Sequence, residues 1–321
     1  MDSAYKILIS LVNWCRYDDT IRCVKELQEF LGKDVSISIV DNASPNDSME
    51  QLLNSLSDVR ILKSETNLGY AAGHLLNVNY ALDNDYDAVW ILNSDVSLRN
   101  NSLSALVDAW RKYGDNIYGS ITLSSENPDI VDYGGGVVPK DSIDKFVYNS
   151  YEGVALDSLP ADFVREVQSV EGSSMFIPLN IIKKYGFMKT DFFMYAEEND
   201  FCYRMRNFGI KSYVVRDSII VHNSAASFKL DVDISWIMSY YRRRNFLRFM
   251  HEHYGWSRFK MLNNSDNLGS RLKFLCLYAL KKAFRQKHIK DYWLLKAVYH
   301  SVLGKSGRMV NPNDYVCFDN D

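Results

Sequence analysis

The 321-residue sequence lacks the marks of several protein classes. Its five cysteines are scattered and include no CxxC pair, which argues against a disulfide scaffold or a zinc site and fits reduced thiols. The N-terminus has no basic stretch followed by an apolar one, so no secretory signal is predicted. The longest apolar run of the C-terminal part, 274–280, is far shorter than the ~20 residues that span a bilayer. We therefore expect a cytoplasmic protein that is not integral to a membrane.

Apolar residues are plentiful, at 47%, which is enough for one large α/β domain or a domain with an appendage. Charge is distributed unevenly. Residues 236–310 hold 16 Lys and Arg against three acids, a net +13, whereas residues 1–235 carry −13. This basic, aromatic-rich C-terminal third indicates an anionic partner, such as a membrane, a lipid diphosphate or a nucleic acid. The alternative is a solvated face that packs on the core through its aromatic residues.

Short apolar runs and helical patterns alternate through the first 113 residues. This order predicts a mostly parallel, Rossmann-like α/β sheet flanked by helices, with ligands at the carboxyl ends of its strands. Three polar loops, containing Asp41, Asn67 and Asp95, would then meet at one rim. Strands are predicted at 6–14, 35–40, 59–62 and 88–92, and helices at 49–56, 71–82 and 102–113.

The pattern becomes less regular after residue 113. Further strands are predicted at 117–123, 137–151, 169–177, 212–215 and 219–221, and this part is expected to be antiparallel. An acid-rich helix start follows at 197–204. Acids in a first helical turn are favoured by the helix dipole, which is their simplest explanation. Beyond residue 236 the chain is predicted to be mainly helical.

A series of motifs in fixed order carries a family resemblance. The chain resembles inverting glycosyltransferases of family 2, which have the GT-A fold, and more narrowly their bacterial rhamnosyltransferase-like members. The likeness covers about residues 7–227, and the C-terminal third matches loosely, mainly at Tyr240-Tyr241 and Arg244-Asn245. The motifs are Leu11-Val12-Asn13-Trp14, Val40-Asp41-Asn42-Ala43-Ser44, Asn67-Leu68-Gly69-Tyr70-Ala71-Ala72-Gly73, Leu92-Asn93-Ser94-Asp95, the block 193–204, and His222 with Ser227.

The resemblance implies both a domain organisation and a reaction. A GT-A domain at 1–235 would comprise a nucleotide-binding half, 1–113, and an acceptor-binding half, 114–235, followed by a basic helical region at 236–321. The implied reaction moves a sugar, with rhamnose as the candidate, from a dTDP- or UDP-sugar. The acceptor would be a hydroxyl of a polysaccharide such as O-antigen or capsule, or of a lipid-linked oligosaccharide at the inner face of the membrane.

The usual Asp-x-Asp motif of the family is here Asn93-Ser94-Asp95, so only its last acid remains. A departing diphosphate must be neutralised, and Mg²⁺ or Mn²⁺ held by oxygen ligands can do this. The resemblance implies Asp95 as a metal ligand, His222 as a second ligand or a diphosphate contact, and Asn93 near the donor. The alternatives are a turn or helix-capping role for Asp95 and a structural role for His222.

Nucleotide binding is expected at the other two loops. Asp41 can accept a hydrogen bond from the imide N–H of uracil or thymine, and Asn42 would help to shape that pocket. An Asx turn before Pro45 explains Asn42 equally well. In the next loop Asn67, Gly69 and Gly73 fit a helix start close to the nucleotide, where backbone must approach ligand.

The acceptor hydroxyl needs a base for an in-line displacement with inversion. The family's Glu-Asp pair is here Glu197-Glu198, and its base position falls on Glu198. On a helix Glu197, Asp200 and Arg204 share one face, while Glu198 points about 100° away. This spacing predicts an Asp200–Arg204 contact and leaves Glu198 for the acceptor. The alternative makes Asp200 the base and Glu198 a metal or sugar contact.

Three rival functions can be weighed. A nucleotidyltransferase would need a glycine-rich, basic loop after the first strand, and residues 13–16 offer none. A nucleic-acid-binding protein would use the basic C-terminal third, but the acidic body argues against it. An inactive sugar-nucleotide-binding scaffold is suggested by the altered residues Asn93 and Glu198.

Overall fold

The structure is a computed structural model that describes residues 5–138, 148–222, 235–257 and 290–315, with a few single positions between 260 and 280. Three features of the sequence fall wholly or largely outside the described residues. They are Ser227 of the family motifs, residues 139–147 of the predicted strand 137–151, and the last six residues.

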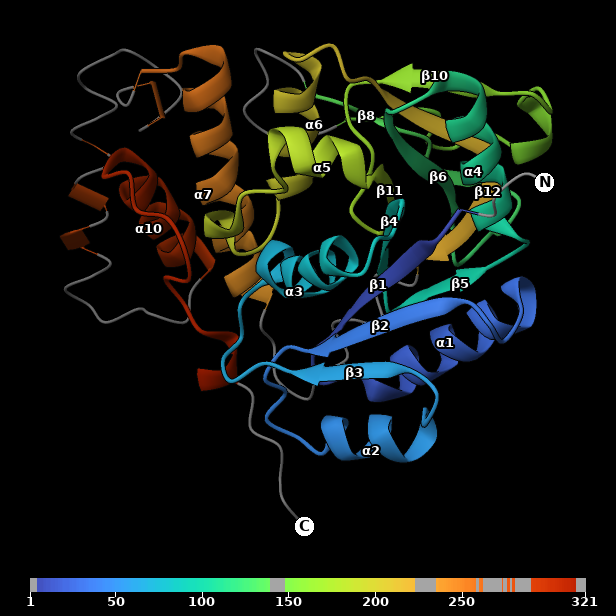
Figure 1. Cartoon of the computed structure of the whole chain (residues 1–321). Coiled ribbons are helices and arrows are strands. Elements are labelled where there is room, and N and C mark those ends of the chain that lie inside the picture. Colours follow the sequence, from blue (N-terminus) through green and yellow to red (C-terminus); the bar gives the residue numbers. More distant parts are fainter. Residues whose placement is uncertain are drawn as a thin grey trace.

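One ten-stranded sheet forms the centre of the molecule (Figure 1). Its strand order is β10-β12-β6-β11-β4-β1-β2-β3, with β5 beside β12 and β7 beside β6. A separate pair joins β8 (Gly136–Val137) and β9 (Tyr148–Asn149). The strands of the large sheet are β1 (Ile7–Asn13), β2 (Ser36–Asp41), β3 (Arg60–Lys63), β4 (Ala88–Asn93), β5 (Val96–Leu98), β6 (Ile117–Leu123), β7 (Val131–Tyr133), β10 (Val164–Val167), β11 (Ser174–Pro178) and β12 (Ser212–His222).

The two halves of the sheet differ in strand direction. β3, β2, β1 and β4 are joined by parallel ladders, as predicted for a Rossmann-like half. In the second half β11 runs antiparallel to both β4 and β6, and β10 runs antiparallel to β12. The ladder between β6 and β12 is parallel, so this half is mixed rather than purely antiparallel.

Helices cover both faces of the sheet. Because β4 is buried on both sides, Val89 and Ile91 enter one hydrophobic cluster while Trp90 and Leu92 enter the other. This explains why its sequence reads as a continuous apolar run. One face carries α1 (Tyr17–Leu31), α2 (Ser48–Ser55) and α4 (Ser102–Tyr113), and the other α3 (Tyr70–Asp83), α5 (Leu179–Tyr185) and α6 (Glu197–Arg206), with short 3-10 turns η1 (Leu156–Ser158) and η2 (Thr190–Phe192).

The C-terminal helices α7 (Ser235–Tyr254) and α10 (Lys290–Val302) pack against each other beside the domain (Figure 1). Trp236 of α7 stacks on Trp293 of α10 with 4.2 Å between ring centroids. Their cluster also includes Phe193, which links them to the loop before α6. Among the described helices none is long and apolar enough to cross a bilayer. After α10 a final turn, η4 (Pro312–Asp314), lies close to the ends of the parallel strands (Figure 1).

Candidate active site

Asp95 and His222, which are far apart in sequence, lie side by side at the carboxyl end of β4. The turn after β4 leads directly into β5, and β5 pairs antiparallel with the end of β12 so that Val96 lies opposite His222. This register brings His222 Nε2 to 3.2 Å from Asp95 Oδ1. The same nitrogen lies 3.2 Å from the Asn93 side-chain amide. All three residues expected around the diphosphate are therefore in contact.

The chemistry of this group fits a divalent cation. A carboxylate and an imidazole with ligand atoms 3.2 Å apart can bind one divalent cation. Burial opposes charging of His222, but the hydrogen bond and the negative charge of Asp95 prevail and raise its pKa to about 9. The surroundings of His222 therefore stabilise a positive charge, and a bound metal ion would also supply one. Asp95 and His222 as ligands stay a prediction that their geometry supports.

Asp41 is completely buried at the end of β2. Its Oδ2 accepts hydrogen bonds from the Asn13 side chain at 2.8 Å and from the Ser44 hydroxyl at 2.6 Å. Its Oδ1 accepts from the Ser44 backbone N–H at 3.1 Å. The turn before Pro45 is thus held by the side chain of Asp41, and not by Asn42, for which the sequence allowed an Asx turn as the alternative. Asp41 thus shapes the loop from inside, and its contact with a nucleotide base remains a prediction.

Asn42 and Asn67 come together, as the rim arrangement predicts. The Asn42 side chain donates to Asn67 Oδ1 at 3.2 Å and to the Gly69 carbonyl at 3.1 Å, and it accepts from the Leu68 N–H at 2.8 Å. Asn67 Oδ1 also accepts from the Gly69 N–H at 3.0 Å. Both asparagines therefore join the loop after β2 to the loop after β3.

The lack of a side chain at Gly69 and Gly73 has a different explanation from the expected approach to a nucleotide. A Cβ on Gly69, at φ +81°, would lie 2.1 Å from the Phe193 carbonyl oxygen. A Cβ on Gly73 would lie 3.1 Å from the Val12 side chain. The close approach is thus between two parts of the protein, and it needs no ligand to explain it. In consequence the start of α3 is joined directly to the loop that precedes α6.

Glu197 and Glu198 occupy the first turn of α6. Burial and the charge of Glu171 raise the pKa of Glu198 to about 7, against the opposing effects of Arg242 and Asn199. Asn199 donates to Glu198 Oε1 at 2.7 Å. Burial and the charge of Glu198 raise the pKa of Glu197 well above its usual range. A half-buried carboxylate that titrates near neutral pH is suited to take a proton from a hydroxyl.

The loop before α6 is held in a strained conformation. Phe193, Tyr195 and Ala196 have φ between +67° and +75°, which costs non-glycine residues of order 1 kcal/mol or more each. Asn245 of α7 compensates, because its side-chain nitrogen lies 2.7–3.0 Å from the carbonyls of residues 192, 194 and 195. Arg244, fully buried beside it, donates to the residue 192 carbonyl at 2.6 Å. The helix α7 thereby fixes the direction in which α6 presents its acids.

Asp200 lies in a dense ion-pair network on the other side of α6. Arg204 Nε is 2.7 Å from its Oδ2, which confirms the predicted contact four residues along the helix. Lys189 and His253 reach Oδ1 at 3.2 and 2.8 Å. Burial opposes ionisation, but these partners lower the pKa of Asp200 to about 2. A carboxylate so weakly basic and fully enclosed is a poor general base, so the geometry favours Glu198.

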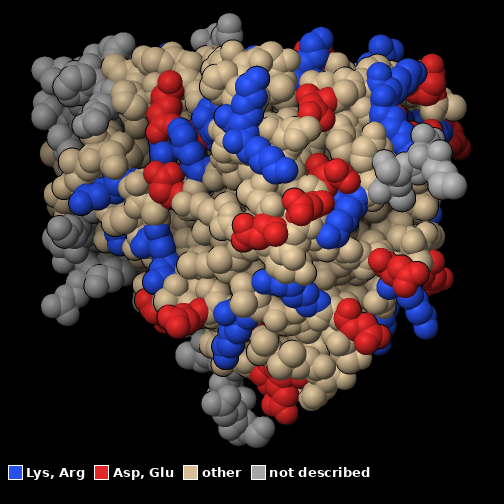
Figure 2. Space-filling view, viewed as in Figure 1, with Lys and Arg blue, Asp and Glu red and all other residues tan. Residues whose placement is uncertain are grey.

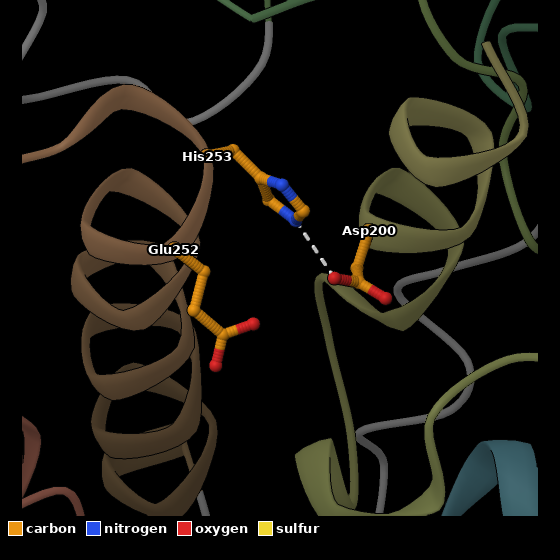
Figure 3. Close-up of side chains that lie close together, drawn as sticks. All are labelled: Asp200, Glu252 and His253. Atoms are coloured by element: carbon orange, nitrogen blue, oxygen red, sulfur yellow. Dashed lines mark hydrogen bonds and ion pairs between the residues drawn. The ribbon is translucent and has the colours of Figure 1, made fainter. Parts of the chain in front are cut away.

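Asp200 also forms a compact group with Glu252 and His253 of α7 (Figure 3). Three such ligand atoms lie within 4.8 Å of one another, as they would around a metal ion. However, Lys189 Nζ already bridges the two carboxylates, at 3.2 Å from Asp200 and 2.8 Å from Glu252. A side-chain ammonium therefore supplies the positive charge, and the group is an ion-pair cluster rather than a metal centre.

Two residues near Glu198 were not singled out from the sequence. Glu171 accepts from Ser173 Oγ at 2.6 Å, and the Ser173 carbonyl binds the Asn93 N–H at 3.0 Å. Its charge helps to raise the pKa of both Glu198 and His222, so Glu171 lies within electrostatic reach of each. The sequence feature that could have pointed to Glu171 is the presence of an acid within the predicted strand 169–177. Arg242, 4.6 Å over the Tyr195 ring, was hidden within a generally basic region.

The surface charge is mixed on the side seen in Figure 2. Acids and bases are interspersed across its described residues, and no large patch of one sign is visible there. Part of the basic excess of α7 is used inside the molecule. Arg244 is fully buried, and Arg248 pairs with Asp191 at 3.0 Å and with Glu252 at 2.7 Å. Counting charges along the sequence therefore overstates what these residues offer to a partner.

The chain has the GT-A fold, and two solved structures share this architecture. The structure of GalNAc-T7 with UDP, GalNAc and Mn²⁺ aligns over 95% of this chain and 59% of that one, with 13% identity and a TM-score of 0.59. Mannosyltransferase PcManGT from Pyrobaculum calidifontis, in complex with GDP-Man and Mn²⁺, aligns over 94% and 88%, with 10% identity and a TM-score of 0.55. At these identities the likeness is one of fold.

Sequence comparison supports a particular family within this class. Residues 8–142 match glycosyl transferase family 2, which confirms the predicted resemblance over that segment. The low-salt glycan biosynthesis hexosyltransferase Agl10 of Haloferax volcanii is 27% identical over 220 residues, 67% of this chain and 66% of that protein. The chain thus aligns with just under two thirds of this relative's length. Both matches support the predicted class, a glycosyltransferase.

Proposed function

We propose that the protein is a hexosyltransferase that moves a sugar from a nucleoside diphosphate donor to a hydroxyl of a glycan acceptor. The observation that carries the proposal is the pairing of two chemistries in one site. Asp95 with His222 is suited to a cation, and Glu198, with its pKa near 7, is suited to a base. Glu171 acts electrostatically on both.

Each group has a defined part in the proposed reaction. A divalent cation held by Asp95 and His222 would neutralise the leaving diphosphate. Glu198 would accept the proton of the acceptor hydroxyl as its oxygen attacks the anomeric carbon. The bond to the diphosphate breaks on the opposite side, so the product has inverted configuration. Asn93 would contact the donor, Glu197 would support the acceptor side, and Asp200 would have the secondary part of holding α6 in place through its ion pairs.

The finer assignments are also proposals. Asp41, Asn42 and Asn67 would form the base-binding side for a UDP- or dTDP-sugar, with Gly69 and Gly73 allowing the loop to pack. Rhamnose is the candidate sugar, and a surface polysaccharide such as O-antigen or capsule is the candidate product. A lipid-linked acceptor would require peripheral binding to an anionic leaflet, which co-sedimentation with anionic and neutral vesicles would check.

A thermal-shift screen of UDP-, dTDP- and GDP-sugars, with Mn²⁺, Mg²⁺ or chelator, tests the proposal. One donor is expected to raise the melting temperature in metal and much less in chelator, because ligand that binds only the folded state stabilises it. Release of nucleoside diphosphate from that donor with an acceptor present would then show transfer. No stabilisation by any donor in any metal would contradict the proposal. Binding without turnover would instead favour a sugar-nucleotide-binding scaffold.

A further inference from the structure

The last described residues return from α10 to the rim of the parallel strands. This segment, residues 307–315, is called here the C-terminal strap, and Figure 1 shows it beside the ends of β3 and α3. Trp14 Nε1 donates to Asn313 Oδ1 at 2.9 Å, and Asn313 Nδ2 donates to the Ala43 carbonyl at 2.7 Å. Arg308 donates to the Asn67 carbonyl at 2.9 Å. The strap therefore binds the loops after β1, β2 and β3, one contact to each.

The strap is itself anchored from behind by α7. The Tyr241 hydroxyl donates to the Val310 carbonyl at 2.7 Å and accepts from the Val310 N–H at 3.0 Å. Arg244 donates to the Gly307 carbonyl at 2.7 Å. Both side chains are completely buried, so these bonds are shielded from water and hold the strap firmly. The strap is therefore an integral part of the rim.

Asn313 is placed to control the shape of the loop after β2. Ala43, whose carbonyl it binds, has φ +58°, an unfavourable value for a residue with a Cβ. The next residue, Ser44, gives two hydrogen bonds to Asp41. A change in the Ala43 turn would consequently disturb Asp41. The other amide atom of Asn313 orients Trp14, whose partly buried ring follows β1.

We propose that the C-terminal strap belongs to the donor site, with Asn313 as a positioning residue that holds Trp14 and the Ala43 turn in the form that receives the nucleoside. The inference rests on the proposed function. It goes beyond that function because the family match ends at residue 142 and assigns no donor role to the strap. It also ties the C-terminal region, which the sequence set apart as a separate basic unit, to nucleotide recognition.

Substitutions of Asn313 test this inference. Asn313→Ala removes both side-chain hydrogen bonds, and we expect nucleoside diphosphate to bind ~10-fold more weakly in Mn²⁺, with a matching rise in donor KM. Acceptor KM and kcat should change less than about twofold, because the reacting groups are untouched. Asn313→Asp keeps an acceptor for Trp14 but loses the donor to Ala43, so an intermediate loss is expected. Asn84→Ala, an exposed asparagine bonded to the Tyr80 carbonyl, is the matched control and should bind normally.

A double-mutant cycle separates positioning from general damage. Trp14→Phe combined with Asn313→Ala should weaken binding less than the sum of the two single changes, because both remove the same bond. Wild-type affinity in Asn313→Ala and Asn313→Asp would overturn the inference and leave the proposed function intact. Equal losses in kcat and in acceptor KM would also overturn it, since they indicate a structural role only. If wild-type protein binds no nucleoside diphosphate at all, the proposed function itself fails.

Discussion

Two acid–histidine pairs of similar composition lie among the described residues, and they differ in their surroundings. At the sheet rim His222 lies 3.2 Å from Asp95, and between α6 and α7 His253 lies 2.8 Å from Asp200. The second carboxylate is neutralised by Lys189 and Arg204, whereas the first pair contacts the neutral amide of Asn93. Pairs of the same residue types therefore become a candidate cation site or a structural lock according to the charges around them.

The same contrast runs along one helix. Glu198 and Asp200 are two residues apart on α6, yet the pKa of Glu198 is raised to about 7 and that of Asp200 is lowered to about 2. Burial raises the pKa of both, but only Asp200 has enough cationic and hydrogen-bonding partners to reverse it. A raised pKa near neutrality suits proton transfer, and a lowered one suits a permanent ion pair.

The largest expected effect comes from the proposed base. Glu198→Gln keeps the size of the side chain but cannot take a proton, so kcat should fall by ~10²–10⁴-fold while donor affinity is unchanged. Steady-state kinetics and calorimetry would measure the two quantities. Glu166→Gln, an exposed glutamate paired with Lys211, is the control. Undiminished turnover in Glu198→Gln would remove this residue from the role.

Substitution of Asp200 in the structural lock between α6 and α7 should lower the stability of the fold. Asp200→Asn leaves Lys189, Arg204 and His253 without their carboxylate, and we expect a loss on the order of 3 kcal/mol in the free energy of unfolding. Denaturant titration would measure it. Asp108→Asn, which breaks an exposed pair with Arg111, should cost less than about 0.5 kcal/mol. A normally stable Asp200→Asn protein that is inactive would reverse our assignment of the two acids.

Asp95→Ala should act on donor binding, which Asp200→Asn is not expected to change directly. Loss of a metal ligand is expected to weaken Mn²⁺-dependent donor binding by at least ~10-fold, since even changes to groups behind the ligands cost about 10–100-fold. Without donor the melting temperature should also fall, because His222 loses the carboxylate that stabilises its positive charge, so donor affinity in Mn²⁺ is the quantity that separates this variant from Asp200→Asn. Calorimetry with and without Mn²⁺ would measure the affinity, and equal donor affinity in both for wild-type protein would count against a metal site here.

The smallest effect is a difference in pH response. Because Glu198 must be deprotonated to act, kcat/KM should rise with pH and level off above about 7. The lowered pKa of Asp200 acts differently. Its stabilisation is complete above the ordinary aspartate value of 3.8 and is lost as pH falls toward 2. Activity should therefore fall between pH 8 and 6 while the melting temperature shows no loss from Asp200, and a parallel fall of both would contradict the separation.

Several elements could be predicted from residue patterns alone. The helix Ser102–Tyr113 and the strand Ile117–Leu123 have the predicted bounds, because the helix has a clear apolar period and Gly114 separates it from the strand. The rim position of the polar loops also followed, since parallel strands share one carboxyl edge. The antiparallel direction of β11 was expected, but its place between β4 and β6 could not be foreseen, because pairing between distant strands leaves no local periodicity.

The sequence by itself determined the class of site: which acids, amides and histidine are available, and which strand ends and helix turns carry them. Tertiary structure decided how they work. The register of β5 on β12 brings His222 to Asp95, ion-pairing across α6 and α7 separates Asp200 from Glu198, and the returning strap places Asn313 against Trp14. The physical reason is that local conformation depends on neighbouring residues, whereas the charge and orientation of a buried group depend on partners contributed by distant segments.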